Sequence, residues 1–173
     1  MKFSLSDSIE ILERTPKALH SLLRNLNDNW TLKNEGSDTW SPYDVIGHLI
    51  HCDESNWIPR IEVALSDFVV RNFEPLDRFA QLEKSKGKTL NQLLNDFVQI
   101  RATSIAALHS LKITNEQLSK TATHPELGSV TLSQLISAWV VHDLNHTSQI
   151  VRVIAKQYQA EVGPWIQYMR VLK

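Results

Sequence analysis

Four long segments of the chain carry apolar residues at helical spacing, and each segment opens with a helix-capping signal. The signal is an aspartate, serine or threonine followed three positions later by an acid or amide side chain, which together can satisfy free N–H groups of a first helical turn. It begins at Asp7, Ser41, Thr89 and Thr131. Strand-like alternation is scarce, so the pattern predicts an all-α fold.

The expected helices lie near residues 7–28, 42–66, 89–111 and 131–157, with a short C-terminal helix after Gly163 and Pro164. Pro16 should kink the first helix or restart it after Thr15, and Pro59 should kink the second, because proline lacks the N–H group that a helix interior uses. Four amphipathic helices favour a four-helix bundle, since each must bury one apolar face. The length fits one domain, residues 1–173.

The composition excludes several classes of partner. The net charge is −1 and no basic stripe stands out, which argues against nucleic acid and against an anionic membrane surface. No apolar run approaches the ~20 residues that cross a bilayer, and the first residues lack the apolar core of a signal peptide. Cys52 is the only cysteine, so no intrachain disulfide can form. We expect a soluble cytoplasmic protein.

Two histidines four positions apart, His142 and His146, lie in the apolar stripe of the fourth predicted helix. Side chains at i and i+4 share one helix face, so the two imidazoles could bind one metal ion. Hydrogen bonds to neighbouring groups could also satisfy them, and for an isolated pair that interpretation is favoured. A third ligand would decide between the two.

The second predicted helix offers that ligand. His48 continues its apolar line, whereas His51 projects toward a more polar side. Gly47 leaves room for a close neighbour. Cys52, one turn beyond His48, could be a fourth ligand, but a small buried apolar side chain is the simpler interpretation. Three inward histidines with an open fourth position are the usual arrangement of a catalytic zinc-type site.

Asp143 follows His142 directly and gives the pattern H-D-x-x-H, which is similar to the H-E-x-x-H of zinc peptidases. Aspartate is one methylene shorter than glutamate, and a helical bundle is not a peptidase context. We interpret Asp143 as a carboxylate that orients an imidazole or as a surface charge. Asp53, Glu54 and Asn145 could have similar roles, but such residues are usually solvated.

Taken together, these segments resemble a known family. The stretch "WSPYDVIGHL", followed about ninety residues later by "LGSVTLSQLISAWVVHDLNHTSQI" and by the ending "VGPWIQYM", resembles the DinB-like (YfiT-like) superfamily of metal-binding four-helix bundles. The resemblance covers nearly the whole chain. It implies an up-down-down-up bundle that binds one divalent ion, most often zinc or nickel, through three histidines. The matching positions are His48, His142 and His146.

The family also implies possible activities and assembly. Members with a known activity include thiol S-transferases that use bacillithiol and a mycothiol-dependent maleylpyruvate isomerase, and others have been proposed to be hydrolases. Many members have no known reaction. DinB-like proteins are often homodimers, so the resemblance implies that this chain could form one.

Three functions remain as alternatives. A metal-dependent enzyme would use the ion to activate a bound water or thiol, for hydrolysis of a small molecule or for S-transfer from a low-molecular-weight thiol, with Asp143 as a supporting carboxylate. A non-catalytic metal-binding or stress-associated protein would use the ion to tie the second and fourth helices together. A plain bundle would bind no metal. Nucleotide substrates are not expected, because the chain lacks a phosphate-binding glycine loop.

Overall fold

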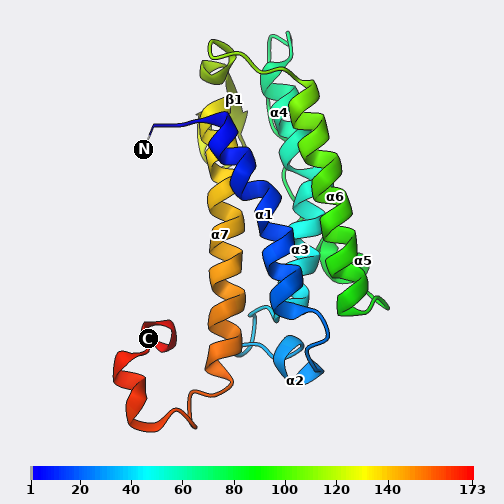
Figure 1. The fold of residues 1–173 in the computed structure, drawn as a ribbon. Coiled ribbons are helices and arrows are strands. Elements are labelled where there is room, and N and C mark those ends of the chain that lie inside the picture. The colour runs from blue at the N-terminus through cyan, green and yellow to red at the C-terminus, as the bar shows by residue number, and fades with distance from the viewer. Residues whose placement is uncertain (1) are drawn as a thin grey trace.

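Four helical segments lie side by side in the computed structural model, which describes residues 2–173. They are α1 (Leu5–Leu23), α3 (Pro42–Ser55) continued by α4 (Trp57–Leu65), α6 (Leu90–Ser110) and α7 (Leu132–Lys156). In Figure 1, α1 and α7 run in one direction, and α3, α4 and α6 run in the other. This order is up-down-down-up, so the predicted fold class is confirmed.

The helices begin at capping residues, as predicted for three of the four segments. Ser41, Thr89 and Thr131 each form a complete capping box with the side chain three positions later. The predicted cap of the first helix was wrong. Ser4 is the N-cap, and its hydroxyl accepts a hydrogen bond from the backbone N–H of Asp7 at 3.2 Å. Asp7 instead lies in the first turn, where its negative charge interacts favourably with the positive end of the helix dipole.

The first helix ends earlier than the sequence suggested, and the second is interrupted but ends at Leu65, close to the predicted residue 66. Helix α1 stops at Leu23, because Asn25 has a left-handed backbone with φ of 60°, a common way to terminate a helix. A separate short helix, α2 (Asp28–Thr31), follows it. The second segment breaks at Asn56, between α3 and α4. The break lies next to Ser55. In an unbroken helix the residue at position 59 would donate its N–H group to the Ser55 carbonyl, and Pro59 has no N–H group.

Helix α1 continues through Pro16 instead of restarting after Thr15. Because Pro16 has no N–H group, the carbonyl of Leu12 one turn earlier lacks its helical partner. Arg101 of α6 supplies the missing donor, with Nη1 at 2.8 Å from the Leu12 oxygen. The proline therefore frees an acceptor that another helix uses.

Arg101 is the centre of a buried ionic network that touches all four helical segments. Its Nε donates to Asp53 of α3 at 2.6 Å, and its Nη1 donates to Asp143 of α7 at 2.5 Å. The guanidinium lies over the rings of Phe97 and Trp139, with Cζ at 5.0 and 5.2 Å from their centroids. These rings belong to the two apolar clusters of the core, so the charge sits where the clusters meet.

The long link after α4 contains a helix that the sequence did not reveal. Helix α5 (Ala80–Lys84) packs against α3, and the Tyr43 hydroxyl donates to the Ser85 carbonyl at 2.6 Å. A Cβ at position 47 would lie 2.4 Å from the Ser85 hydroxyl. Gly47 is therefore the point of close approach that the sequence predicted.

A short hairpin precedes α7 and was also not predicted. Strands β1 (Thr121–His124) and β2 (Gly128–Thr131) pair antiparallel, and Gly128 with φ of 74° completes the turn. Four-residue strands without apolar alternation give no periodic signal. The C-terminal helix takes the form of two 3-10 helices, Gly163–Tyr168 and Arg170–Leu172, and a third one, Gln117–Ser119, precedes β1. Within residues 2–173, no helix is long and apolar enough to cross a membrane.

Replacing Arg101 by methionine should destabilise the protein by about 3–5 kcal/mol, because two buried carboxylates lose their counter-ion. The control Arg14→Met removes an exposed arginine whose ion pair with Glu10, at 3.6 Å, is solvated, and it should cost less than about 1 kcal/mol. Urea unfolding of both variants measures the difference. Equal losses would contradict a structural role for the network.

Candidate metal centre

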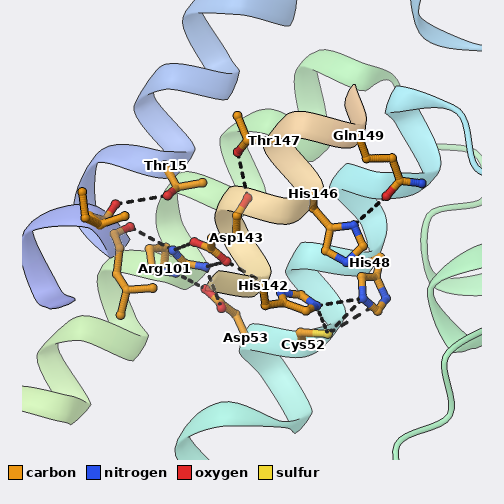
Figure 2. Close-up of polar contacts among 12 residues, drawn as sticks. Thr15, His48, Cys52, Asp53, Arg101, His142, Asp143, His146, Thr147 and Gln149 are labelled. Carbon is orange, nitrogen blue, oxygen red and sulfur yellow. Dashed lines mark hydrogen bonds and ion pairs between the residues drawn. The ribbon is translucent and has the colours of Figure 1, made fainter. Parts of the chain in front are cut away.

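The structure brings His48, His142 and His146 together inside the bundle. One ligand-type atom from each lies within 4.8 Å of the other two. His48 comes from α3 and the other two from α7, and Figure 2 shows their rings facing one another. The helices that carry them are neighbours, as expected. The cluster has the composition and compactness of a three-histidine metal site.

Two of the three histidines, His48 and His146, are buried and stay neutral near pH 7. Burial, together with the neighbouring imidazoles, lowers the pKa of His48 to about 3 and that of His146 to about 4. A neutral imidazole keeps a lone pair on one ring nitrogen, which a metal ion requires. The same burial that opposes a proton on these rings therefore leaves them available as ligands.

Gln149 fixes the tautomer of His146. Its side-chain oxygen lies 2.8 Å from His146 Nδ1, and an amide oxygen can only accept, so Nδ1 carries the proton. The lone pair is then on Nε2. Hydrogen bonds of this kind orient the histidine ligands of metal sites. The role of Gln149 was not predicted, although its position three residues after His146 on one helix face was a usable sign.

The remaining nitrogens of the cluster fit a shared cation. His48 Nε2 and His142 Nε2 lie 3.1 Å apart, which needs a proton or a cation between two acceptor nitrogens. Two nitrogens bound to one tetrahedral ion at ~2.0–2.1 Å are about 3.3–3.4 Å apart. Buried His142 Nδ1 has no hydrogen-bond partner within residues 2–173. The donor set therefore suits a divalent metal ion.

Cys52 lies beside the cluster. Its Sγ is 3.5 Å from His48 Nε2 and 3.9 Å from His142 Nε2. Burial raises the pKa of the thiol to about 12, with a further contribution from the nearby carboxylates, so without a cation it stays protonated. In this state Cys52 packs as a small buried side chain, and it could act as a fourth ligand only as a thiolate bound to a metal ion.

His51 is buried, contrary to the expectation of a polar side, but it belongs to a different environment. Its Nε2 lies 3.0 Å from the Asp77 carbonyl oxygen, and its Nδ1 lies 3.2 Å from Lys84 Nζ. The link that contains α5 covers this face of α3, and no sequence pattern indicated that cover. His51 thus takes no part in the three-histidine cluster.

Asp143 is not a surface charge but lies beside the His142 imidazole, and its role in orienting that ring stays a prediction. It is fully buried, and its Oδ1 is 3.9 Å from His142 Nδ1, too far for a hydrogen bond. Burial tends to raise the pKa of Asp143, but the nearby His142 ring and the positive Arg101 guanidinium outweigh it, and the pKa is lowered. Asp53 is buried as well, and there burial dominates and raises the pKa to about 6 despite Arg101.

The histidine cluster lines a cavity of about 500 Å³. The link after α4 and the hairpin before α7 form other parts of its wall. Trp40 lies against His48 with ring centroids 4.7 Å apart, and Trp57 meets His142 edge-on at 5.1 Å. Trp57 also stacks on Trp139, so it packs the core and forms part of the cavity wall. A volume of this order is typical of a small-molecule site.

The fold and the cluster agree with what comparison with known proteins reveals. The model of the DinB superfamily matches residues 11–150, most of the chain, and the protein belongs to this superfamily. No curated protein matches the sequence.

Among solved structures, the chain is similar to YfiT from Bacillus subtilis, with a TM-score of 0.74 and 19% sequence identity. The similarity covers 92% of this chain and 90% of that one. YfiT is described as a probable metal-dependent hydrolase with an unusual four-helix bundle topology. At this level of identity the likeness establishes the shared fold.

Protein purified without chelator should carry about one divalent ion per chain, as expected for a single three-histidine site. His142→Ala should lose most of the metal, because only two histidines of the cluster remain. His51→Ala is the matched control and should retain it, since His51 contacts Asp77 and Lys84 instead. Elemental analysis of the folded fraction measures both. Loss of metal from the His51 variant with retention in the His142 variant would refute this assignment.

His146→Gln should make the metal-free protein less sensitive to acid. The pKa of His146 is about 4 in the folded state, and it is near 6.5 in an unfolded chain, so between these values only the unfolded state binds the proton. The imidazole therefore costs almost no stability above about pH 7.5 and about 1.4 kcal/mol at about pH 5.5. Urea unfolding at both ends of this range should show a fall that is smaller in the variant by about that amount. An identical fall in both proteins would show that His146 titrates normally.

Proposed function

We propose that the protein is a metal-dependent hydrolase that acts on a small molecule at the His48–His142–His146 centre, with zinc or nickel as the ion. The single observation that carries the proposal is the convergence of three histidines on the wall of a cavity. Three neutral ligands leave a divalent ion its full charge. A metal ion in that state lowers the pKa of a bound water and polarises a carbonyl group.

The protein's own residues would prepare this chemistry. The three imidazoles hold the ion, and the hydrogen bond from His146 to Gln149 keeps one ligand in the correct tautomer. Trp40 packs against His48 and Trp57 against His142, so the two aromatic rings form apolar walls beside these ligands. The cavity leaves space for a substrate next to the ion.

The number of ligands supports a catalytic site over a structural one. Structural zinc sites are usually closed by four protein ligands, commonly with cysteine thiolates, whereas catalytic sites have three and an open position. The cluster contains three histidines, and the description of YfiT as a probable metal-dependent hydrolase agrees with the same chemistry in this fold. The same centre could activate a low-molecular-weight thiol for S-transfer, because a bound thiol is acidified in the same way.

The proximity of Cys52 supports a second candidate, a non-catalytic site in which the ion ties α3 to α7. Its Sγ at 3.5 Å from His48 Nε2 would need only a small movement to become a fourth ligand. A closed site would leave no position for substrate. The Cys52→Ala variant separates the candidates, because an open site should keep about one equivalent of metal without the thiol.

The direct test is a screen of the protein loaded with zinc or nickel against small esters and amides, and against electrophiles with a low-molecular-weight thiol. We expect turnover of an ester or amide that falls by at least about 100-fold in His142→Ala, since the ion lowers the barrier by several kcal/mol. Circular dichroism would verify that the variant is folded. Turnover that is unchanged in His142→Ala would disprove a reaction at this centre, and loss of metal from Cys52→Ala would favour the non-catalytic site.

A further inference from the structure

Arg60 lines the same cavity as the histidine cluster, and its side chain is fixed in place. It belongs to α4, and its Nη2 donates to the Glu74 carbonyl at 2.9 Å. The guanidinium lies over the ring of Phe73, with 5.2 Å from Cζ to the ring centroid. These contacts occupy one face and one N–H group. The other N–H groups of the guanidinium remain available.

Arg60 has no carboxylate partner within residues 2–173. By contrast, Arg101 pairs with two aspartates, and Arg152 pairs with Glu35 at 2.7 Å. Arg60 is half-buried, and burial lowers its pKa, which reflects the cost of keeping the cation away from water. Buried charges are normally paired, so an arginine held in a cavity without a partner is suited to an anion that comes from outside.

The rest of the cavity does not neutralise this charge. Glu126 is the one carboxylate among its lining residues within 2–173, and it faces Arg78 at 3.9 Å, with both side chains largely exposed. His124 accepts backbone N–H groups at Nδ1, from Glu126 at 3.2 Å and from Leu127. Its proton is therefore on Nε2, which adds another donor. The lining thus has an excess of positive charge and donors before any metal ion is counted.

We propose that the cavity binds a small organic carboxylate, whose carboxylate group pairs with Arg60 while its reactive group lies at the histidine centre. This inference rests on the proposed function and adds the class of substrate to it. Arginine binds carboxylates well because its planar N–H groups match the two oxygens. A cavity of about 500 Å³ holds a metal-bound group and a short linker to the carboxylate, as expected for a small-molecule site.

Paired hydroxamates test the inference by binding, without any need for turnover. Acetohydroxamate binds an open metal position and has no other charge. Dicarboxylic acid monohydroxamates carry the same group and a distal carboxylate, on a linker that can be lengthened by one methylene at a time. Isothermal titration of the zinc-loaded protein should show that one member of the series binds about tenfold more tightly than acetohydroxamate, as one charged hydrogen-bonded pair would provide.

The Arg60→Gln variant should abolish this preference and retain its zinc, and its affinity for acetohydroxamate, which has no distal carboxylate, should fall much less than its affinity for the preferred probe. Arg60→Lys keeps the charge and should retain part of the preference. Arg14→Gln is the matched control, since it removes one positive charge from an exposed position outside the cavity, and it should keep the full preference.

Each other outcome has a separate meaning. Equal affinities for all probes in the wild-type protein, or a preference that survives in Arg60→Gln, would overturn the carboxylate inference and leave the open metal site intact. If zinc is bound but no hydroxamate binds, the site is closed. That result would overturn both the proposed function and the inference that the substrate is a carboxylate.

Discussion

The buried guanidinium of Arg101 is the interaction on which the arrangement of the bundle depends. Projecting from α6, it contacts the Leu12 carbonyl of α1, Asp53 of α3 and Asp143 of α7. Charged groups in a core are expensive unless every partner is in place, so alternative registers of these helices would leave a charge unpaired. The network therefore specifies how α3 and α7 lie relative to each other, and those two helices carry the histidines. Pro16 contributes by freeing the Leu12 acceptor.

The core thus contains two polar clusters, one made of paired charges and one made of histidines. Around Arg101 the groups are charged and paired, while in the neighbouring histidine cluster burial opposes the protonation of His48 and His146 (Figure 2). The histidines line the cavity of about 500 Å³, and within residues 2–173 the Nδ1 atom of His142 lacks a hydrogen-bond partner. A rigid, paired network beside an under-coordinated one is the arrangement expected of a pre-organised binding site.

The sequence predicted what depends on local periodicity and missed what depends on distant contacts. The capping boxes at Ser41, Thr89 and Thr131 set three helix starts correctly, since a cap and its partner are three residues apart. The inward placement of the three histidines followed from helix faces together with the family resemblance. Asp53 was interpreted as solvated because its partner Arg101 lies 48 residues away. The cover over His51 likewise comes from a link with no periodic pattern.

X-ray absorption spectroscopy of the zinc-loaded protein tests the central claim, that three histidines hold a metal ion with an open position, most directly. We predict three imidazole nitrogens at ~2.0–2.1 Å, one further light atom from solvent, and no sulfur. A sulfur shell at ~2.3 Å would show that Cys52 closes the site, and fewer than three imidazoles would show that the cluster does not act as one ligand set. Either result would contradict an open three-histidine metal centre in this bundle.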